Sequence, residues 1–243
     1  TSGLGSFDLN SAVVQTPINL YQADLASGVK EKHYSFERKD GKKIESFVVD
    51  VDVHNPSVSI EAGTPNDGES YGLQPVRKQA EAANGDNYQV VAAVNADFYN
   101  MATGEPNGIV YKDGKAIKAY NGSWRFFGMT KSGEAVIGSA AEYEVMKDQL
   151  QEALGGNAIL VKGGQIYQTP QTGADKEPRT AVGIKADGDV FFVVIDGRQE
   201  PYSAGISMPD LAQLMMDLGA VDALNLDGGG SSTFTTRELG GDQ

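Results

Sequence analysis

A carboxylate followed by three glycines is the chemically most suggestive feature of the sequence. Residues 225–232 read Asn-Leu-Asp-Gly-Gly-Gly-Ser-Ser and directly follow an apolar stretch. Consecutive glycines cost backbone entropy, but they let a ligand approach the main chain, where N–H groups can hold an anion or a sugar oxygen. We therefore expect Asp227 to be the principal catalytic carboxylate, and a loop capped by its own acid is the simpler alternative. The substrate ligands expected from this segment are Asn225, Gly228, Gly229, Gly230 and Ser231.

A second polar cluster follows another apolar stretch. Residues 90–94 are apolar, and the next six residues read Asn-Ala-Asp-Phe-Tyr-Asn. Polar side chains at the end of a strand are well placed for binding and catalysis. Asn95 is therefore expected to hold a sugar hydroxyl, and Asp97 to be a further catalytic acid. The alternative is that both side chains bond only the amides of a turn.

Two arginines stand where polar segments meet apolar ones. Arg179 lies in the word Pro-Arg-Thr-Ala-Val-Gly, and Arg198 ends the word Val-Ile-Asp-Gly-Arg. The planar guanidinium fork binds phosphate or carboxylate through two hydrogen bonds. Arg179 is therefore expected to be the principal phosphate ligand, with Arg198 and Thr180 lining the same site. Asp196 is expected as a further catalytic acid, and a surface ion pair with it or with Glu200 is the alternative for Arg198.

The aromatic cluster Trp124, Phe126 and Phe127 has two interpretations. It could form a platform on which a sugar ring stacks, but a cluster in the core is the favoured interpretation, because aromatic side chains dominate cores energetically. The two histidines, His33 and His54, are interpreted as satisfied surface or core residues rather than as catalysts.

The composition excludes several classes of site. The 243 residues include no cysteine, which rules out disulfides, thiolate nucleophiles and cysteine-ligated metals. With two histidines a multi-histidine metal site is not expected; no cofactor is required, and a calcium ion is compatible with a structural role. Twenty basic against 33 acidic residues give a net charge of −13, which disfavours nucleic acid and anionic lipid as partners. No apolar run reaches the roughly 18 residues of a membrane span.

The elements that must position these residues are strands in hairpins and a few helices. Four hairpins are predicted, because Asp-Gly, Ser-Gly or Gly-Gly between two apolar runs supplies the positive φ values of tight turns. Their strands are residues 109–112 with 116–119, 127–130 with 135–137, 159–162 with 165–167, and 181–185 with 190–195. Apolar residues at helical spacing predict three helices, over residues 74–83, over 142–154, and from a cap at Ser207 to Gly219.

These elements predict an α+β fold, a single mixed domain with a mostly antiparallel or mixed sheet, several hairpins and about three helices. We expect the domain over residues 41–243, after an N-terminal extension of residues 1–40. Asp97 and Asp227 each follow a helix, a glycine and a strand in the pattern Asn-x-Asp. If the two segments are equivalent, both carboxylates are delivered to one cleft.

Taken in order, these segments resemble the phosphodiester glycosidase family. The matching words include those that begin at Asn95, at Pro178, at Asp196 and at Asn225, and the resemblance spans residues 45–234. The family usually has glycine where this chain has Asp97. Family members also commonly continue past the triple glycine with a further strand, so we expect this chain to lack a C-terminal segment.

The resemblance implies hydrolysis of a glycosyl phosphodiester at the anomeric carbon of the sugar, with release of a sugar and a phosphate monoester. Such a reaction needs cations or amides that hold the phosphate charge and a carboxylate beside the positively charged sugar of the transition state. These are the roles expected of Arg179 and Asp227. The cysteine-free, acidic composition and the start without Met favour a bacterial protein exported to the cell wall or beyond.

Two other classes of function stay open at this stage. A non-catalytic cell-surface module that binds an anionic glycopolymer would keep the arginines and the glycine loop and need no competent carboxylates. A metal-dependent phosphodiesterase would use Asp97, Asp196 and Asp227 as oxygen ligands of a metal. Binding without sugar release would indicate the first class, and loss of activity in a chelator the second.

Overall fold

Nine strands form the largest sheet of the protein. The computed structural model describes residues 1–120, 122, 124–167 and 175–237. In spatial order the strands are β1 (Ser2–Gly5), β2 (Thr16–Ala26), β3 (Val29–Glu37), β4 (Lys43–Val51), β14 (Val190–Ile195), β13 (Arg179–Lys185), β15 (Ala220–Asn225), β11 (Ala158–Lys162) and β12 (Gln165–Ile166). The segment expected as an N-terminal extension, residues 1–40, contributes β1, β2 and β3, and β3 pairs with β4 along its whole length.

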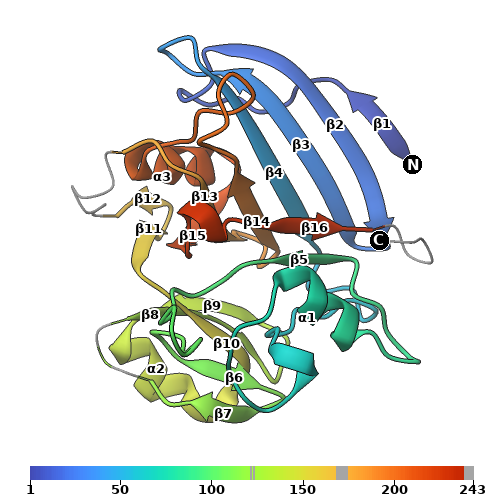
Figure 1. Ribbon diagram of the computed structural model, residues 1–243, viewed down its shortest axis with the longest axis vertical. Helices are drawn as coiled ribbons and strands as arrows, with labels where there is room; N and C mark the ends of the chain where they lie inside the picture. Colours follow the sequence, from blue (N-terminus) through green and yellow to red (C-terminus); the bar gives the residue numbers. More distant parts are fainter. Residues whose placement is uncertain (121, 123, 168–174, 238–243) are drawn as a thin grey trace.

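A five-stranded sheet and a strand pair complete the β-structure. The five strands, in spatial order, are β7 (Lys115–Lys118), β6 (Val110–Lys112), β10 (Leu150–Gly156), β8 (Arg125–Thr130) and β9 (Ala135–Gly138). The pair β16 (Phe234–Thr236) and β5 (Ala92–Val94) runs between the two larger sheets (Figure 1). The four predicted hairpins are confirmed as β6–β7, β8–β9, β11–β12 and β13–β14.

Every pairing between the named strands is antiparallel. For the hairpins this follows from their short turns, because two-residue connections can join only antiparallel neighbours. The helices of the described residues are α1 (Val76–Ala83), α2 (Ala140–Met146) and α3 (Met208–Asp217), with short 3-10 turns at η1 (Pro65–Asp67), η2 (Lys147–Gln149) and η4 (Gly229–Ser231). The predicted α+β fold, with its mostly antiparallel sheets and three helices, is confirmed.

Helix α3 forms as its sequence predicts. The Ser207 hydroxyl accepts the Asp210 N–H and caps the first turn, which satisfies one of the amides that a helix start leaves without an intrahelical partner. The apolar face of the helix, with Leu211, Leu214 and Met215, is fully buried in the cluster that also holds residues of the nine-stranded sheet. This packing covers one face of the sheet (Figure 1).

The helix predicted over residues 142–154 is wrong in its second half. The capping box of Ser139 and Glu142 starts α2 as a helix, but α2 ends at Met146, and residues 150–156 form the central strand β10. Leu150 and Ala153 are buried there among the same apolar side chains that Tyr143 contacts from α2. The apolar stripe thus faces one core, although it belongs to a helix followed by a strand.

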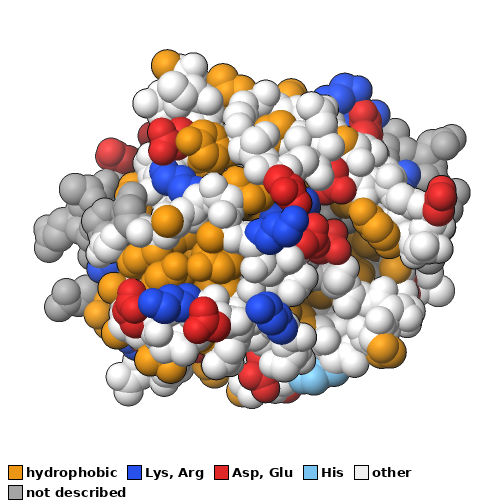
Figure 2. Space-filling view, turned by 90° about the horizontal axis from the view of Figure 1, so that it is seen from below, with side chains coloured by type: hydrophobic (Ala, Val, Ile, Leu, Met, Phe, Trp, Pro, Cys, Tyr) orange, Lys and Arg blue, Asp and Glu red, His pale blue; other side chains and the backbone are white. Residues whose placement is uncertain are grey.

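A second apolar layer joins the two larger sheets. Val182 and Leu224 of the nine-stranded sheet cluster with Phe127 and Met129 of the five-stranded sheet. Figure 2 views the molecule from the end where the smaller sheet and α2 lie, and shows a hydrophobic patch bordered by acidic and basic side chains. No helix of the described residues is long and apolar enough to cross a membrane. The inner layer brings the ends of β5, β10 and β15 to one junction.

Candidate active site

The Asn95 side chain ties three segments together at this junction. Its Nδ2 donates to the carbonyl oxygen of Asp227 at 2.7 Å, and its Oδ1 accepts the Thr180 hydroxyl at 2.8 Å and the Thr233 N–H at 3.0 Å. Asn95 is buried and Thr180 fully so. Asn95 therefore fixes the end of β5 to the start of β13 and to the residues after β15. Its predicted contact with a sugar hydroxyl stays a prediction.

Asp227 follows β15, and hydrogen bonds hold both its backbone and its carboxylate. Its N–H donates to the Ala96 carbonyl at 2.7 Å, and its carboxylate accepts the Gly228 N–H at 2.8 Å. Burial raises the pKa of the Asp227 carboxyl above its ordinary value, and the hydrogen bond from Ser231 opposes this shift. Asp227 is half-buried, so its position is fixed while part of the residue still reaches solvent.

Asp97 lies in a small cradle made by two glycines. Its Oδ2 accepts the Gly108 N–H at 2.5 Å, and a Cβ at Gly155 would stand only 2.5 Å from the same oxygen. The absence of a side chain at Gly155 is therefore what makes room for the carboxyl. Its Oδ1 is buried and has no hydrogen-bond partner among the described residues.

The Asp97 carboxyl has a strongly perturbed pKa. Burial is the main cause of its value of about 6; the charge of Asp227 contributes a smaller part of the rise, and the Gly108 and Phe98 amides and Lys118 oppose it. A carboxyl with a pKa near 6 can both give and accept a proton near neutral pH, which is what general acid–base chemistry needs. The Asn-x-Asp pattern predicted that the segments of Asp97 and Asp227 meet.

The glycine loop packs tightly against the start of β13. A Cβ at Gly228 would stand 2.7 Å from the Pro178 carbonyl oxygen, so only glycine fits there. The Gly229 N–H donates to that carbonyl at 2.9 Å, and Gly229 adopts a φ of 58°. A Cβ at Gly230 would meet nothing within 4 Å. The first two glycines thus serve close packing, and the third faces open space where a ligand could approach.

The two predicted arginines differ in their surroundings. The Arg198 guanidinium nitrogens are 3.5 Å from the position of a Cβ at Gly229, and Arg198 pairs with Glu177 while 60% of its side chain is exposed. Arg179 is half-buried, and it donates from Nε to the Ile206 carbonyl at 3.1 Å and from a terminal nitrogen to Asp175 at 2.7 Å. Arg198 is thus the cation that the structure places beside the glycine loop, and the role of Arg179 as principal phosphate ligand stays a prediction.

Asp196 directly follows β14, the neighbour of β13, and belongs to a charged cluster that sequence reasoning missed. Burial raises its pKa, the charge of Glu45 adds to the rise, and His33 opposes it. Glu45 is buried and accepts hydrogen bonds from His33 and from Ser35. No pattern in the sequence indicates this cluster, because its members come from β3, β4 and β14 and meet only through strand pairing.

Three of the four buried side-chain atoms without a hydrogen-bond partner among the described residues lie on these same segments. They are Oδ1 of Asp97, Oδ1 of Asn225 and Oγ of Ser232. Asn225 donates from Nδ2 to Asn157 at 2.8 Å. Most buried polar atoms in proteins have partners, and exceptions call for an explanation such as a functional role. Their concentration at one junction marks it as the candidate active site.

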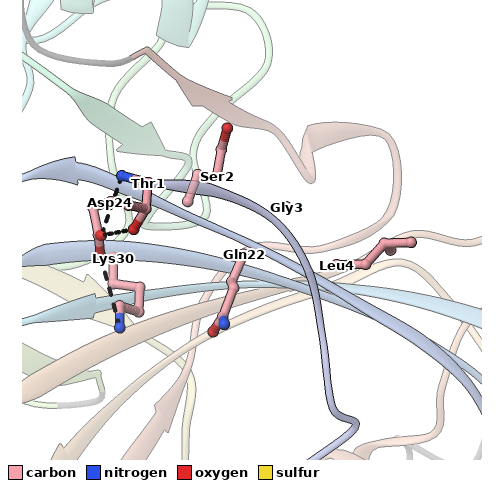
Figure 3. Close-up of a pocket in the computed structure, with 8 residues that line it drawn as sticks. Thr1, Ser2, Gly3, Leu4, Gln22, Asp24 and Lys30 are labelled. Carbon is pink, nitrogen blue, oxygen red and sulfur yellow. Dashed lines mark hydrogen bonds and ion pairs between the residues drawn. The ribbon is translucent and has the colours of Figure 1, made fainter.

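Two other features of the described residues lie elsewhere. Asp52, His54 and Asp189 form the one group whose ligand atoms lie close enough to share a metal ion, and this group includes none of the predicted catalytic acids. A hollow of 190 Å³ at the β1 edge of the large sheet is lined by residues 1–4 and 22–24 with Lys30 (Figure 3). Asp24 is paired there with the N-terminus and with Lys30. Three strands and β14 separate this edge from β13.

Known proteins resemble this chain in sequence. The model of the phosphodiester glycosidase family matches residues 88–242. N-acetylglucosamine-1-phosphodiester alpha-N-acetylglucosaminidase of Mus musculus is 32% identical over 161 residues, which cover 58% of this chain and 31% of that protein. The enzyme of the same name from Homo sapiens is 30% identical over 161 residues, with the same two coverages of 58% and 31%. The SPbeta prophage-derived protein YomE of Bacillus subtilis is 34% identical over 157 residues, or 58% of this chain and 23% of that one.

Solved structures share the fold. A hypothetical protein from Synechocystis superposes with a TM-score of 0.70 at 14% identity, over 89% of this chain and 59% of that one. The catalytic domain of the zebrafish N-acetylglucosamine-1-phosphodiester alpha-N-acetylglucosaminidase, auto-inhibited by its pro-peptide, superposes with a TM-score of 0.66 at 23% identity, over 97% of this chain and 78% of that one. This chain spans less than a third of the length of the mouse, human and Bacillus relatives. Because the family model covers more than half of its residues, the chain belongs to the phosphodiester glycosidase family.

Proposed function

We propose that the protein hydrolyses a glycosyl phosphodiester at the anomeric carbon of its sugar and releases the sugar and a phosphate monoester. The observation that carries the proposal is the meeting of two acid-bearing segments, in which Asn95 and Ala96 bond the Asp227 backbone and so bring Asp97 and Asp227 to one junction, next to an open glycine and an exposed arginine. The family relatives named for cleavage of an N-acetylglucosamine phosphodiester support the same reaction class.

Asp227 is the carboxylate that stabilises the sugar in the transition state. As the glycosidic C–O bond breaks, positive charge develops on the sugar ring, and an ionised carboxylate beside it lowers the barrier. The Gly228 N–H and the Ser231 hydroxyl favour the charged form of Asp227 and so oppose the effect of its burial. The same carboxylate could attack the anomeric carbon or activate water, and the two routes differ in the stereochemistry of the product.

Asp97 is the group that exchanges a proton. A carboxyl with a pKa of about 6 is protonated often enough near neutral pH to give a proton and ionised often enough to accept one. The departing phosphate is weakly basic, so it needs its charge held more than it needs a proton. Arg198 lies beside the glycine loop and is the cation placed for this task.

The proposal includes a location outside the cell. The acidic, cysteine-free composition fits a bacterial protein exported to the wall or beyond, where polymers joined by sugar–phosphate bonds would be its substrates. N-acetylglucosamine is the first sugar to test, because the mouse and human relatives are named for it.

Replacement of the principal carboxylate tests this function. Asp227→Asn keeps the size of the side chain, and we expect it to lower sugar release from a glycosyl phosphodiester by at least about 10³-fold, measured by quantifying free sugar. Asp222→Asn, on β15 and in contact with the Gly163 amide, is the matched control and should keep turnover within about threefold of the unaltered protein.

Three outcomes would contradict the proposal. Unchanged turnover in a folded Asp227→Asn protein would remove Asp227 from catalysis. Saturable binding of the phosphodiester with no sugar release by the unaltered protein would indicate a binding module. Complete loss of activity in a chelator, restored by a divalent metal, would favour the metal-dependent mechanism.

A further inference from the structure

The aromatic cluster that the sequence assigned to the core divides into two parts in the structure. Phe126 and Phe127 are buried, with 0% and 7% of their surface exposed. Trp124 is half-buried instead, and its ring contacts Phe98 with the centroids 5.6 Å apart. Phe98 directly follows the candidate acid Asp97. Trp124 thus belongs to the border of the candidate active site rather than to the core.

The pairing of β8 with β10 brings Trp124 close to the segment that carries Asp97. Phe126 of β8 lies opposite Gly155 of β10, whose vacant side-chain position is filled by the Asp97 carboxyl. Trp124 directly precedes β8, next to Arg125, which lies opposite Gly156. Its ring meets Phe98, the residue that follows Asp97, so the indole lies at the start of β8 beside the Asp97 segment.

Neighbouring contacts fix the position of this aromatic pair. The Tyr120 hydroxyl donates to the Trp124 carbonyl at 2.6 Å, and the Phe98 carbonyl accepts the Asn107 N–H at 2.7 Å. Each ring thus stands on backbone that is held at a defined place. A preformed wall of this kind binds a ligand with little loss of conformational freedom.

We propose that Trp124 and Phe98 form the aromatic wall on which the sugar ring of the substrate packs, beside Asp97. A pyranose ring has an apolar face of C–H groups with partial positive charge, and the face of an indole carries partial negative charge. Ligand sites combine such aromatic walls with a few polar groups that fix orientation, and Asp97, next to Phe98 in the chain, supplies one here. The inference rests on the proposed function for the choice of ligand, but sugar binding can be measured without turnover.

Trp124 is the single tryptophan of the chain, so its fluorescence reports on this site alone. The unaltered protein is titrated with N-acetylglucosamine, glucose and galactose, and separately with inorganic phosphate. We expect a saturable change of tryptophan emission with at least one sugar and none with phosphate. An emission change with phosphate alone, or no saturable change with any of the three sugars, would overturn the assignment.

Kinetics provide the second readout. We expect Trp124→Leu to raise KM for the glycosyl phosphodiester about three- to tenfold with kcat within about threefold, and Trp124→Phe to lie closer to the unaltered protein. Tyr21→Leu, an exposed aromatic on β2, is the matched control and should leave KM unchanged. Unchanged KM in Trp124→Leu would overturn the aromatic wall. A saturable emission change in a protein that releases no sugar would instead support the wall and contradict the proposed hydrolysis.

Discussion

Two buried acids of the smaller sheet, Asp97 and Glu152, make an instructive comparison. Glu152 lies on β10 and is 5% exposed, and Asp97 fills the vacant position of Gly155 on the same strand. Burial raises the pKa of both carboxyl groups, to about 6 for Asp97 and to about 7 for Glu152. By burial and pKa alone the two residues would be ranked as equal candidates for catalysis.

Their hydrogen bonds separate them. The two carboxylate oxygens of Glu152 accept the Ala62 and Asp113 amides. Glu152 also lies near the buried Lys112, whose ammonium pairs with Asp67 at 2.8 Å. The charges around the two acids are alike, since Asp97 lies near Lys118 and Asp227 as Glu152 lies near Lys112 and Asp113, but Asp97 keeps one buried oxygen without a partner among the described residues. A buried acid whose two oxygens are both satisfied serves the fold, whereas one with an unsatisfied oxygen beside the glycine loop is available for chemistry. The hydrogen bonds of a perturbed carboxyl therefore tell more than the size of its pKa shift.

The largest effect that this comparison predicts is on turnover. We expect Asp97→Asn to lower kcat about 10³-fold, because an amide cannot exchange a proton, and Glu152→Gln to leave kcat within about threefold. Both replacements keep the size of the side chain. Steady-state sugar release by the two variants at one pH measures the difference.

Equal losses in the two variants would contradict the distinction between them. Loss of turnover in Glu152→Gln alone would reverse the assignment and place the catalytic acid on β10. Circular dichroism and the unfolding midpoint of each variant serve as the control for folding.

The second effect concerns stability and tests the structural half of the comparison. Lys112 is 6% exposed and donates to the Ala62 carbonyl as well as to Asp67. Lys112→Met would leave the buried acid Glu152 without its neighbouring cation. Such a loss typically costs about 3 kcal/mol or more of the free energy of unfolding. Lys118→Met, near Asp97, is the matched replacement, and we expect less than half of that loss. Denaturant unfolding of both variants gives the two values, and equal losses would contradict the assigned roles.

Local sequence patterns predicted the elements of the fold that depend on neighbouring residues. The four hairpins follow from their turn glycines, and α3 follows from its cap and apolar face. The helix predicted over residues 142–154 was wrong, because a short helix followed by a strand on the same core produces a similar apolar spacing. Gly155, just after the predicted helix, is a place of close backbone approach, where a Cβ would stand 2.8 Å from Gly108.

The sequence predicted those site residues that directly follow a strand. Asp97, Asp227 and Asn95 were identified because each follows an apolar run, and the structure brings them together. Glu45 and Glu152 carry no such signal, because each also has a partner far away in the sequence, Ser203 at the Glu45 amide and the Ala62 amide at the Glu152 carboxylate. The contrast between Arg179 and Arg198 was also invisible, since their exposure depends on loops that pack only in three dimensions.

The smallest effect is on how stability depends on pH, and it differs between the two acids. A carboxyl whose pKa is higher in the folded state binds more protons there than in the unfolded state, so its ionisation lowers stability as pH rises between the two values. For Asp97 that window runs from 3.8 to about 6, and for Glu152 from 4.5 to about 7. We expect the stability of Asp97→Asn relative to the unaltered protein to grow across the first window, by about 3 kcal/mol in total, and to stay constant above it.

The same series on Glu152→Gln sharpens the comparison. Its relative stability should keep changing up to pH 7, because the Glu152 carboxyl still ionises above pH 6 in the folded protein. Unfolding midpoints of both variants and of the unaltered protein between pH 4 and 8 show the pH at which each relative stability stops changing. If the two variants level off at the same pH, the acids are not separated by their surroundings. The relative stability of Asp97→Asn could also stay level over the whole pH range. Asp97 would then ionise as it does in the unfolded chain, and it could not hold the proton that the proposed reaction needs.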